Sequence, residues 1–152
     1  MANRQVPVRA DLPVKRSTAE WKELLEPDAF HVLVERGTER SGTSPLNDEM
    51  RPGVFTCGGC SAPLFPAEAK YDSGTGWPSF YAAYETAVEE TIQPMYMLGD
   101  MSAREVRCAS CGGHLGHVFG DGPEPTRRRY CMNGVALQFK PAPVKTGEVP
   151  HV

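Results

Sequence analysis

Two Cys-x-x-Cys pairs constrain the fold of this chain more than any other feature of its sequence. Cys57 and Cys60 form the first pair, Cys108 and Cys111 form the second, and glycines accompany both. Four thiolates complete the tetrahedral shell of a zinc ion and leave it no open coordination position. We therefore predict a structural zinc site that joins two distant segments and whose loss partly unfolds the protein. Redox-active pairs or free thiols are the alternatives.

A fifth cysteine, Cys131, remains outside these pairs and follows Arg129-Tyr130. A lone thiol in a chain that also carries histidines is a candidate nucleophile. If this segment is a strand, Arg129, Cys131 and Asn133 lie on one face, and the positive charge of Arg129 favours the thiolate. The alternative is a buried cysteine that packs as a small hydrophobic residue.

Two histidines, His114 and His117, follow the second cysteine pair directly. In a regular strand their rings would face opposite ways, so a shared site requires a bulge or a turn, which Gly113 and Gly116 permit. Histidine is the usual proton donor near neutral pH. The alternatives are additional metal ligands or polar surface residues.

Two further residues have both a structural and a functional interpretation. Trp77 lies in the glycine-rich segment 73–80, where it either covers the core or forms the wall of a small apolar pocket. Asp121 could orient a histidine, or could shape the turn that an Asp-Gly pair favours.

Length and composition favour a single globular domain, because the chain has 152 residues, of which 40% are hydrophobic and 23% charged. A formal net charge of −3 argues against nucleic acid or an anionic membrane as the main partner. The sequence shows neither a long apolar run nor an apolar N-terminal stretch, so we expect a cytoplasmic protein. A reducing compartment also suits its thiols.

The pattern along the chain predicts a short helical segment followed by a β core. A capping box starts at Ser17, and a second helix begins at Pro27 and ends at Gly37. Trp21, Leu24 and Leu25 would form the apolar face of the first helix. Short apolar stretches then predict antiparallel strands in segments 54–56, 81–88, 105–108, 115–119 and 130–139. We expect a catalytic domain over residues 17–141, flanked by flexible tails at 1–16 and 142–152.

Taken together, these motifs resemble the zinc-containing methionine-R-sulfoxide reductases of type B. The similarity covers about residues 17–141, and the matching segments are 57–60, 71–80, 105–119, 121–123 and 129–133 with Leu137 and Phe139. The resemblance implies an α+β, mainly β fold of two antiparallel sheets after short N-terminal helices. It also implies thiol-dependent reduction of the R epimer of methionine sulfoxide, protein-bound or free, through a cysteine sulfenic acid. The implied partners are oxidised proteins and thioredoxin or another thiol reductant, with neither nucleic acid nor membrane.

The resemblance also implies a role for each matching residue. The catalytic set comprises the nucleophile and the polar groups around the sulfoxide oxygen, namely Cys131, His117, His114 and Asn133. The substrate-binding set comprises the aromatic residue against the methyl group and its neighbours, namely Trp77, Phe119, Arg129 and Asp121. The implied ligands of one structural zinc ion are Cys57, Cys60, Cys108 and Cys111.

Two segments depart from the family pattern. Thr75 stands where many relatives carry a second, resolving cysteine, so we expect an outside thiol to recycle Cys131 directly. Residues 88–104 match the pattern poorly and receive no role. Two other functions remain open: a zinc-knuckle binding module without catalysis, and a disulfide oxidoreductase that uses its Cys-x-x-Cys pairs.

Overall fold

The computed structural model describes residues 12–92 and 103–143, and this part of the chain is mainly β, as predicted. The outer parts of both expected tails, residues 1–11 and 144–152, lie outside the described residues, as do residues 93–102. The two α-helices are α1 (Thr18–Leu24) and α2 (Pro27–Leu33). The strands are β1 (Gly53–Cys57), β2 (Pro63–Pro66), β3 (Lys70–Tyr71), β4 (Ser79–Phe80), β5 (Val88–Ile92), β6 (Arg104–Cys108), β7 (His114–Phe119), β8 (Arg129–Met132) and β9 (Leu137–Pro141).

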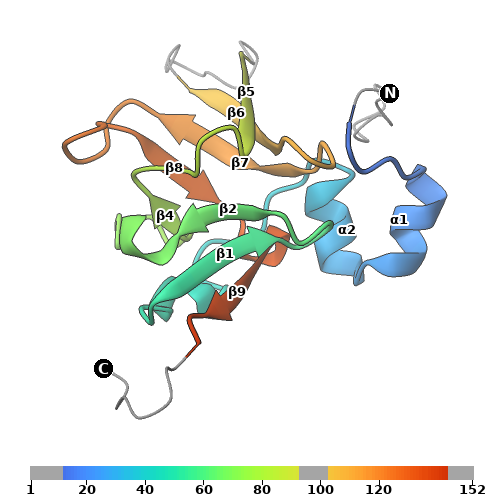
Figure 1. Ribbon diagram of the computed structural model, residues 1–152, viewed down its shortest axis with the longest axis horizontal. Helices are drawn as coiled ribbons and strands as arrows, with labels where there is room; N and C mark the ends of the chain where they lie inside the picture. The colour runs from blue at the N-terminus through green and yellow to red at the C-terminus, as the bar shows by residue number, and fades with distance from the viewer. Residues whose placement is uncertain (1–11, 93–102, 144–152) are drawn as a thin grey trace.

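The strands form two antiparallel sheets. One has the order β2-β1-β9 and the other the order β3-β4-β8-β7-β6-β5, in the part of the chain that the structure describes. Figure 1 shows both helices at one end of the sheets, beside the turns that connect β1 to β2 and β6 to β7. Those two turns carry the Cys-x-x-Cys pairs. Within residues 12–92 and 103–143, none of the helices has the length and hydropathy needed to cross a membrane.

The start of α1 confirms the predicted capping box. The Ser17 hydroxyl accepts a hydrogen bond from the Glu20 backbone N–H at 3.1 Å, and the Glu20 carboxylate accepts one from the Ser17 N–H at 2.9 Å. Trp21 is buried as expected, but Leu24 is 61% exposed and therefore does not belong to the apolar face. Leu25, at the C-cap, is partly buried and packs against the core, so Trp21 and Leu25 form that face.

The second helix begins at Pro27 as predicted but ends at Leu33, before Gly37. The chain leaves it through Arg36, which has the left-handed φ of 62°. Gly37 then packs on the ring of His31, where a Cβ would lie 2.2 Å from Nε2. Gly37 itself is not left-handed, and the His31 ring it meets is an exposed side chain, so neither feature requires glycine at this position.

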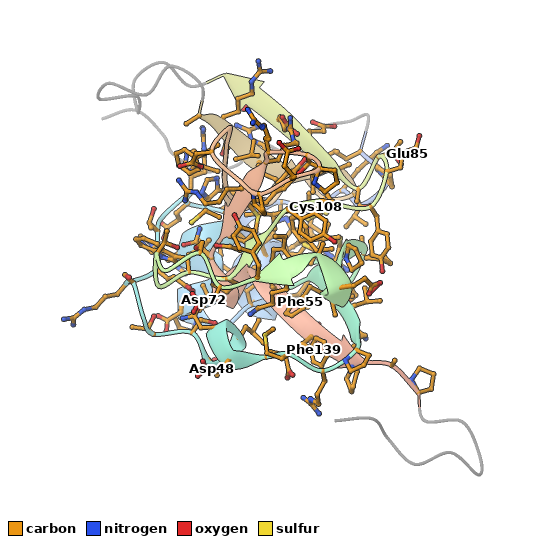
Figure 2. The ribbon with its side chains drawn as sticks, turned by 90° about the vertical axis from the view of Figure 1, so that its left-hand side faces the viewer. Asp48, Phe55, Asp72, Glu85, Cys108 and Phe139 are labelled. Atoms are coloured by element: carbon orange, nitrogen blue, oxygen red, sulfur yellow. The ribbon has the colours of Figure 1, made fainter. Side chains whose placement is uncertain are left out.

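Aromatic side chains fill the space between the sheets. Phe65 stacks on Phe80 with ring centroids 4.4 Å apart, and Phe55 meets Phe80 edge-on at 4.9 Å. Phe55 and Phe65 belong to one sheet and Phe80 to the other, so these contacts join the two layers. Figure 2 shows Phe55 beside Phe139 within the smaller sheet, and their ring centroids are 4.9 Å apart.

Two of the predicted strands are wrong in extent. Segment 81–88 is mostly loop, and β5 begins only at Val88. Segment 130–139 is not one strand, because a 3-10 turn, η4 (Gly134–Ala136), separates β8 in the larger sheet from β9 in the smaller one. Gly134 lies against Ser44, whose Oγ would be 1.9 Å from an added Cβ, so the chain can cross between sheets here only with glycine.

Candidate active site

An open cleft of about 160 Å³ lies over the strands β7 and β8, and Cys131 is in its wall. His117 on β7 pairs directly with Cys131 on β8, so both side chains project from the same face of the sheet. The lining is part apolar and part polar: Thr38, Trp77, Gly116, His117, Phe119, Cys131 and Asn133. The cleft therefore brings together five of the eight residues predicted to act on the substrate.

Cys131 is mainly in its protonated, thiol form in this environment. Burial raises the pKa of the thiol above its ordinary value, and the Thr75 hydroxyl and the Arg129 charge oppose that shift only in part. The sequence predicted that Arg129 favours the thiolate. Its effect has the expected direction, but desolvation outweighs it.

His114 and His117 are brought together by an irregularity in the strand pairing. The register of β6 against β7 shifts between Val106 and Arg107, so that Leu115 is an extra residue on β7. As a result the two rings lie on the same side, with centroids 5.5 Å apart and an interplanar angle of 70°. His117 lines the cleft, whereas His114 lies behind it and is only 3% exposed.

Burial, together with the neighbouring His114, lowers the pKa of His117 to about 4. At neutral pH its ring is therefore a neutral imidazole, which can accept a proton before it donates one. The tautomer of His114 is fixed from behind, because its Nδ1 lies 2.6 Å from a carboxylate oxygen of Glu105.

Glu105 is a fully buried carboxylate at the centre of a charged network. Arg36 donates two hydrogen bonds to it, at 2.8 and 3.0 Å, and Arg107 donates one at 2.9 Å. The hydroxyl of Thr91 lies 3.2 Å away. Burial alone would raise the pKa of Glu105, but the hydrogen bond with His114 and the charges of His114, Arg107 and Arg36 together lower it to about 2. The carboxylate is thus ionised and orients His114.

Trp77 and Asn133 are held in place by the backbone of one residue, Glu39. The Trp77 indole N–H donates to the Glu39 carbonyl at 3.1 Å, and the Glu39 N–H donates to the Asn133 side-chain carbonyl at 2.8 Å. The Glu39 carboxylate in turn accepts from the Val135 N–H at 2.9 Å. The amide group of Asn133 donates to the Leu115 carbonyl at 3.0 Å, so its orientation is fixed on both sides.

Arg129 and Phe119 form the rim of the cleft beside Cys131. The guanidinium lies over the Phe119 ring, 4.2 Å from its centroid, and Asp121 binds it through two hydrogen bonds of 2.8 and 3.2 Å. Asp121 does not contact a histidine in any of these interactions. Its contact is with Arg129, so it supports the rim of the cleft instead of orienting an imidazole.

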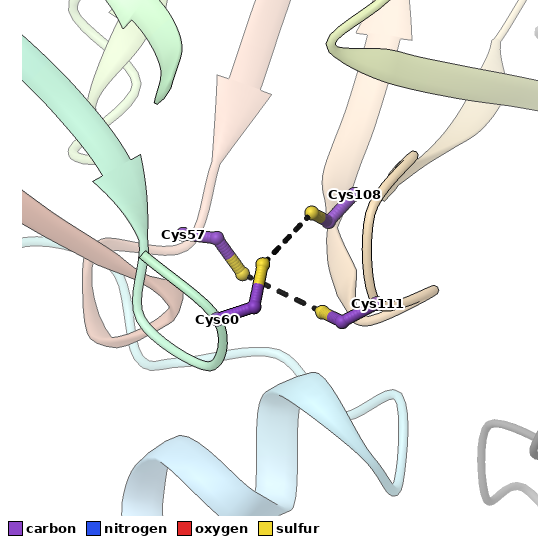
Figure 3. Close-up of side chains that lie close together, drawn as sticks. All are labelled: Cys57, Cys60, Cys108 and Cys111. Carbon is purple, nitrogen blue, oxygen red and sulfur yellow. Dashed lines mark hydrogen bonds between the residues drawn. The ribbon is translucent and has the colours of Figure 1, made fainter. Parts of the chain in front are cut away.

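The four remaining cysteines form a separate cluster between the two sheets. Their sulfur atoms all lie within 4.8 Å of one another, a distance that suits binding of a metal ion. Cys57 and Cys60 come from the end of β1, and Cys108 and Cys111 from the end of β6, so the cluster joins the sheets (Figure 3). All five cysteines are free of disulfide bonds.

The two turns that carry these cysteines have the same backbone design. The Ser61 N–H donates to the Cys57 carbonyl at 2.9 Å, and the Gly112 N–H donates to the Cys108 carbonyl at 2.8 Å. Ser61 and Gly112 are both left-handed, with φ of 67° and 78°. One backbone N–H in each turn also points at a sulfur, from Gly59 to Cys57 at 3.3 Å and from Ser110 to Cys108 at 3.4 Å. Such donors stabilise thiolate ligands.

Sequence reasoning missed the supporting residues Arg36, Thr38, Glu39 and Glu105. The first three follow a helix end and carry no motif of their own. Glu105 offered a weak signal, because the alternation Glu105-Val106-Arg107 places two opposite charges on one face of a strand.

The family model and the curated relatives agree on one family. The model of the SelR domain matches residues 25–141. The peptide methionine sulfoxide reductase MsrB of Methanosarcina barkeri is 46% identical over 132 residues, which are 86% of this chain and 91% of the relative. The MsrB of Agrobacterium fabrum is 45% identical over 129 residues, 84% of this chain and 93% of that protein. The chloroplastic peptide methionine sulfoxide reductase B2 of Arabidopsis thaliana is 42% identical over 84% of this chain and 62% of its own length.

A solved structure, a Mis18 'Yippee-like' domain, aligns over 62% of this chain at 22% identity with a TM-score of 0.48, a likeness too slight to bear on function. The SelR match spans both cysteine pairs, the two histidines and Cys131, and the identity to several relatives is well above 30% over most of both chains. The chain therefore belongs to the SelR-domain family, that of the MsrB peptide methionine sulfoxide reductases.

Proposed function

We propose that this protein reduces the R epimer of methionine sulfoxide, chiefly within oxidised proteins, with Cys131 as nucleophile. The observation that carries the proposal is the pairing of Cys131 with His117 in a cleft that also has an aromatic wall. A sulfoxide is a poor electrophile until its oxygen receives a proton or a strong hydrogen bond. The site offers a thiol for the sulfur and a proton-carrying group for the oxygen within the same small space.

The aromatic side chains of the cleft bind the methionine side chain. Trp77 and Phe119 provide apolar surface for the methyl group and the adjacent methylene. Arg129 holds Phe119 in place from one side and Asp121 holds Arg129. Asn133 lies at the polar end of the cleft, where its fixed amide contributes to the binding of the sulfoxide oxygen.

His117 carries the proton in this mechanism. The ring is neutral at pH 7 because its pKa is about 4, so it can accept the Cys131 proton, and once protonated it is a strong acid that donates this proton to the sulfoxide oxygen. The thiolate attacks sulfur and forms an S–S bond, the hydroxyl group moves from the substrate sulfur to the Cys131 sulfur, and the S–S bond then breaks to leave Cys131 as S–OH. Methionine sulfur gains the two electrons that Cys131 loses, and the thiol proton remains on the transferred oxygen.

His114 acts through His117 in this proposal. It is buried, its Nδ1 faces the ionised Glu105, and its ring contacts His117. This arrangement supports His117 as the proton donor and His114 as a positioning residue. The Glu105 carboxylate fixes the position and the tautomer of His114. The His114 ring in turn holds the His117 ring against Cys131.

An external thiol recycles the sulfenic acid. The neighbour that lowers the pKa of Cys131 through a hydroxyl group is Thr75, and not a cysteine, and the other four thiols are gathered in the separate cluster. Two thiol groups of thioredoxin or of a small dithiol therefore reduce the S–OH group, releasing water and leaving a disulfide on the reductant. Five reduced cysteines fit a reducing compartment such as the cytosol.

We propose zinc as the metal of the four-cysteine cluster. A tetrahedral ion with Zn–S bonds of about 2.3 Å requires sulfurs about 3.8 Å apart. The Sγ atoms of Cys57 and Cys111 are 3.7 Å apart, and those of Cys60 and Cys108 are 3.6 Å apart. Four protein ligands leave no position for a substrate, so the ion would hold the sheets together and take no part in the reaction.

The direct test is turnover of the separated R and S sulfoxide epimers of a blocked methionine, with dithiothreitol as reductant. We expect reduction of the R epimer alone, and loss of that reduction in Cys131→Ser. A protein with its metal bound that reduces neither epimer would instead be a zinc-knuckle binding module.

A further inference from the structure

A second open pocket, of about 340 Å³, lies next to the cleft that contains Cys131, and we call it the side pocket. Thr38 lines both spaces, so the cleft and the side pocket meet at this residue. The other lining residues of the side pocket come from α2, from the segment after it and from η4: Asp28, His31, Val32, Glu39, Arg40, Thr43 and Val135. The chemistry at the sulfoxide itself requires none of these other residues except Glu39, through its backbone.

Glu39 forms the wall between the two spaces. Its backbone N–H and carbonyl bind Asn133 and Trp77, which line the cleft. Its carboxylate accepts a hydrogen bond from the Val135 N–H, and both of these residues line the side pocket. The wall of the cleft therefore continues into the wall of the side pocket, and the same contacts fix the position of one relative to the other.

A methionine sulfoxide that belongs to a protein brings its polypeptide with it. When its side chain fills the cleft, the main chain next to it must run over an adjoining surface. The side pocket is such a surface, because most of its lining residues are exposed and Val32 and Val135 add apolar area between polar groups. A free amino acid has no neighbouring residues to place there.

The segment after α2 presents main-chain groups with which a polypeptide can pair. The N–H and carbonyl of Thr38 and the N–H of Arg40 make no hydrogen bond within residues 12–92 and 103–143. Both residues are exposed, so an incoming chain can reach these groups. An extended peptide that pairs with free main-chain groups gains affinity whatever its side chains are.

Arg40 adds a charged donor to this surface. Its guanidinium makes no ion pair in the part of the chain that the structure describes, and its carbonyl accepts from the Thr43 hydroxyl at 2.6 Å, which holds the backbone in place. A guanidinium has five N–H donors and no acceptor, so it matches the carbonyl oxygens of a peptide main chain. The Asp28 carboxylate, which lines the same pocket, supplies an acceptor for peptide N–H groups.

We propose that the side pocket binds the main chain of an oxidised protein next to its methionine sulfoxide. Arg40 and the free backbone groups of Thr38 and Arg40 hold that main chain. The site thereby selects a sulfoxide within a polypeptide over the same group on a single amino acid. This selection rests on the proposed function and adds to it the residues that set the substrate class.

The test compares two substrates with the R sulfoxide: N-acetylmethionine amide and an end-blocked pentapeptide with methionine between two alanines on each side. One or two net hydrogen bonds to the main chain should make the wild-type kcat/KM about tenfold or more higher for the peptide. Arg40→Ala should lower the peptide value about three- to tenfold. Thr43→Phe, which places a ring in the side pocket, should remove most of the peptide advantage. Neither residue lines the cleft, so both variants should keep the wild-type value for the blocked amino acid.

Two control variants accompany the test. Thr43→Val removes the hydrogen bond to the Arg40 carbonyl without adding a ring, and it should keep most of the peptide advantage. Arg127→Ala removes an exposed arginine that does not line either space, and it should stay within about twofold of the wild type on both substrates. The blocked amino acid also reports whether each variant is folded.

Equal wild-type values for the two substrates would overturn the proposal, as would a peptide value that either Arg40→Ala or Thr43→Phe leaves unchanged. A parallel loss on both substrates in these variants would overturn it too. Binding of the fluorescein-labelled peptide to Cys131→Ser, measured by anisotropy, separates the side pocket from the reaction. If the wild type reduces neither epimer, binding that both side-pocket substitutions weaken in the Cys131→Ser background would uphold the side pocket and reject only the proposed function. Binding that they do not weaken would overturn the side pocket itself.

Discussion

Replacing Glu105 by glutamine should destabilise the protein more than any change to a surface charge. The variant keeps the size of the side chain but removes the charge that faces Arg36, Arg107 and His114 in the interior. Both arginine side chains are at least three-quarters buried, and Glu105 is fully buried, so water cannot replace the lost partner. Loss of one member of such a network leaves the remaining charges uncompensated.

The magnitude follows from the pKa of Glu105, which is lowered from the ordinary 4.5 to about 2. A lowering of that size corresponds to about 3 kcal/mol of stability at neutral pH. Because the folded-state pKa is the lower one, this contribution is complete above pH 4.5 and is lost as the pH falls towards 2. For a domain of this length, about 3 kcal/mol lowers Tm by roughly 6–12 °C.

The assay is urea and thermal unfolding at neutral pH, with metal content measured on the same samples. Glu124→Gln is the matched control, because it removes the same charge from an ion pair with Arg127 in which both side chains are more than 70% exposed. We expect less than about 0.5 kcal/mol for the control. If Glu105→Gln were as stable as Glu124→Gln, the account of the buried network would be wrong. The gap between Glu105→Gln and the wild type should also narrow below pH 4.5.

Three further substitutions address the metal site, the cleft and the recycling step. Cys108→Ser should lose the metal and much of the fold, since binding energy is folding energy in such sites; a stable, fully active and metal-free variant would contradict this. Trp77→Ala should remain folded but lose about 10- to 200-fold in kcat/KM for the sulfoxide, and an unchanged value would make Trp77 only a cover of the core. Thr75→Cys should form a disulfide with Cys131 after one turnover, detectable by mass spectrometry of the unreduced digest, because Thr75 is close enough to lower the pKa of Cys131.

The sequence predicted the elements whose signal is local. The capping box at Ser17 and the proline start of α2 depend on neighbouring residues, and both are confirmed. Segment 130–139 was interpreted as one strand, although it contains Asn133-Gly134, a local turn signal at the point where β8 and β9 separate. It is divided by the close packing of Gly134 on Ser44, a contact between residues far apart in the sequence.

In the candidate site too, local motifs could be predicted from the sequence, whereas contacts between distant residues could not. Five of the predicted residues line the cleft, and the four clustered cysteines meet as their spacing indicated. The pairing of Glu105 with Arg107 had a weak signal in the strand alternation, but its contact with Arg36 could not be predicted, because the two residues are 69 positions apart. Glu39 acts through its backbone N–H and carbonyl, which every residue possesses, so side-chain chemistry gave no indication of it.

A single turnover without reductant shows whether Cys131 takes the oxygen of the substrate. One equivalent of the R sulfoxide is added to the metal-bound protein in the presence of dimedone, and the digest is analysed by mass spectrometry together with the metal content. We expect a dimedone adduct on Cys131 alone, one equivalent of methionine product and full retention of the metal. An intramolecular disulfide between Cys131 and any of the four clustered cysteines, with release of the metal, would contradict it.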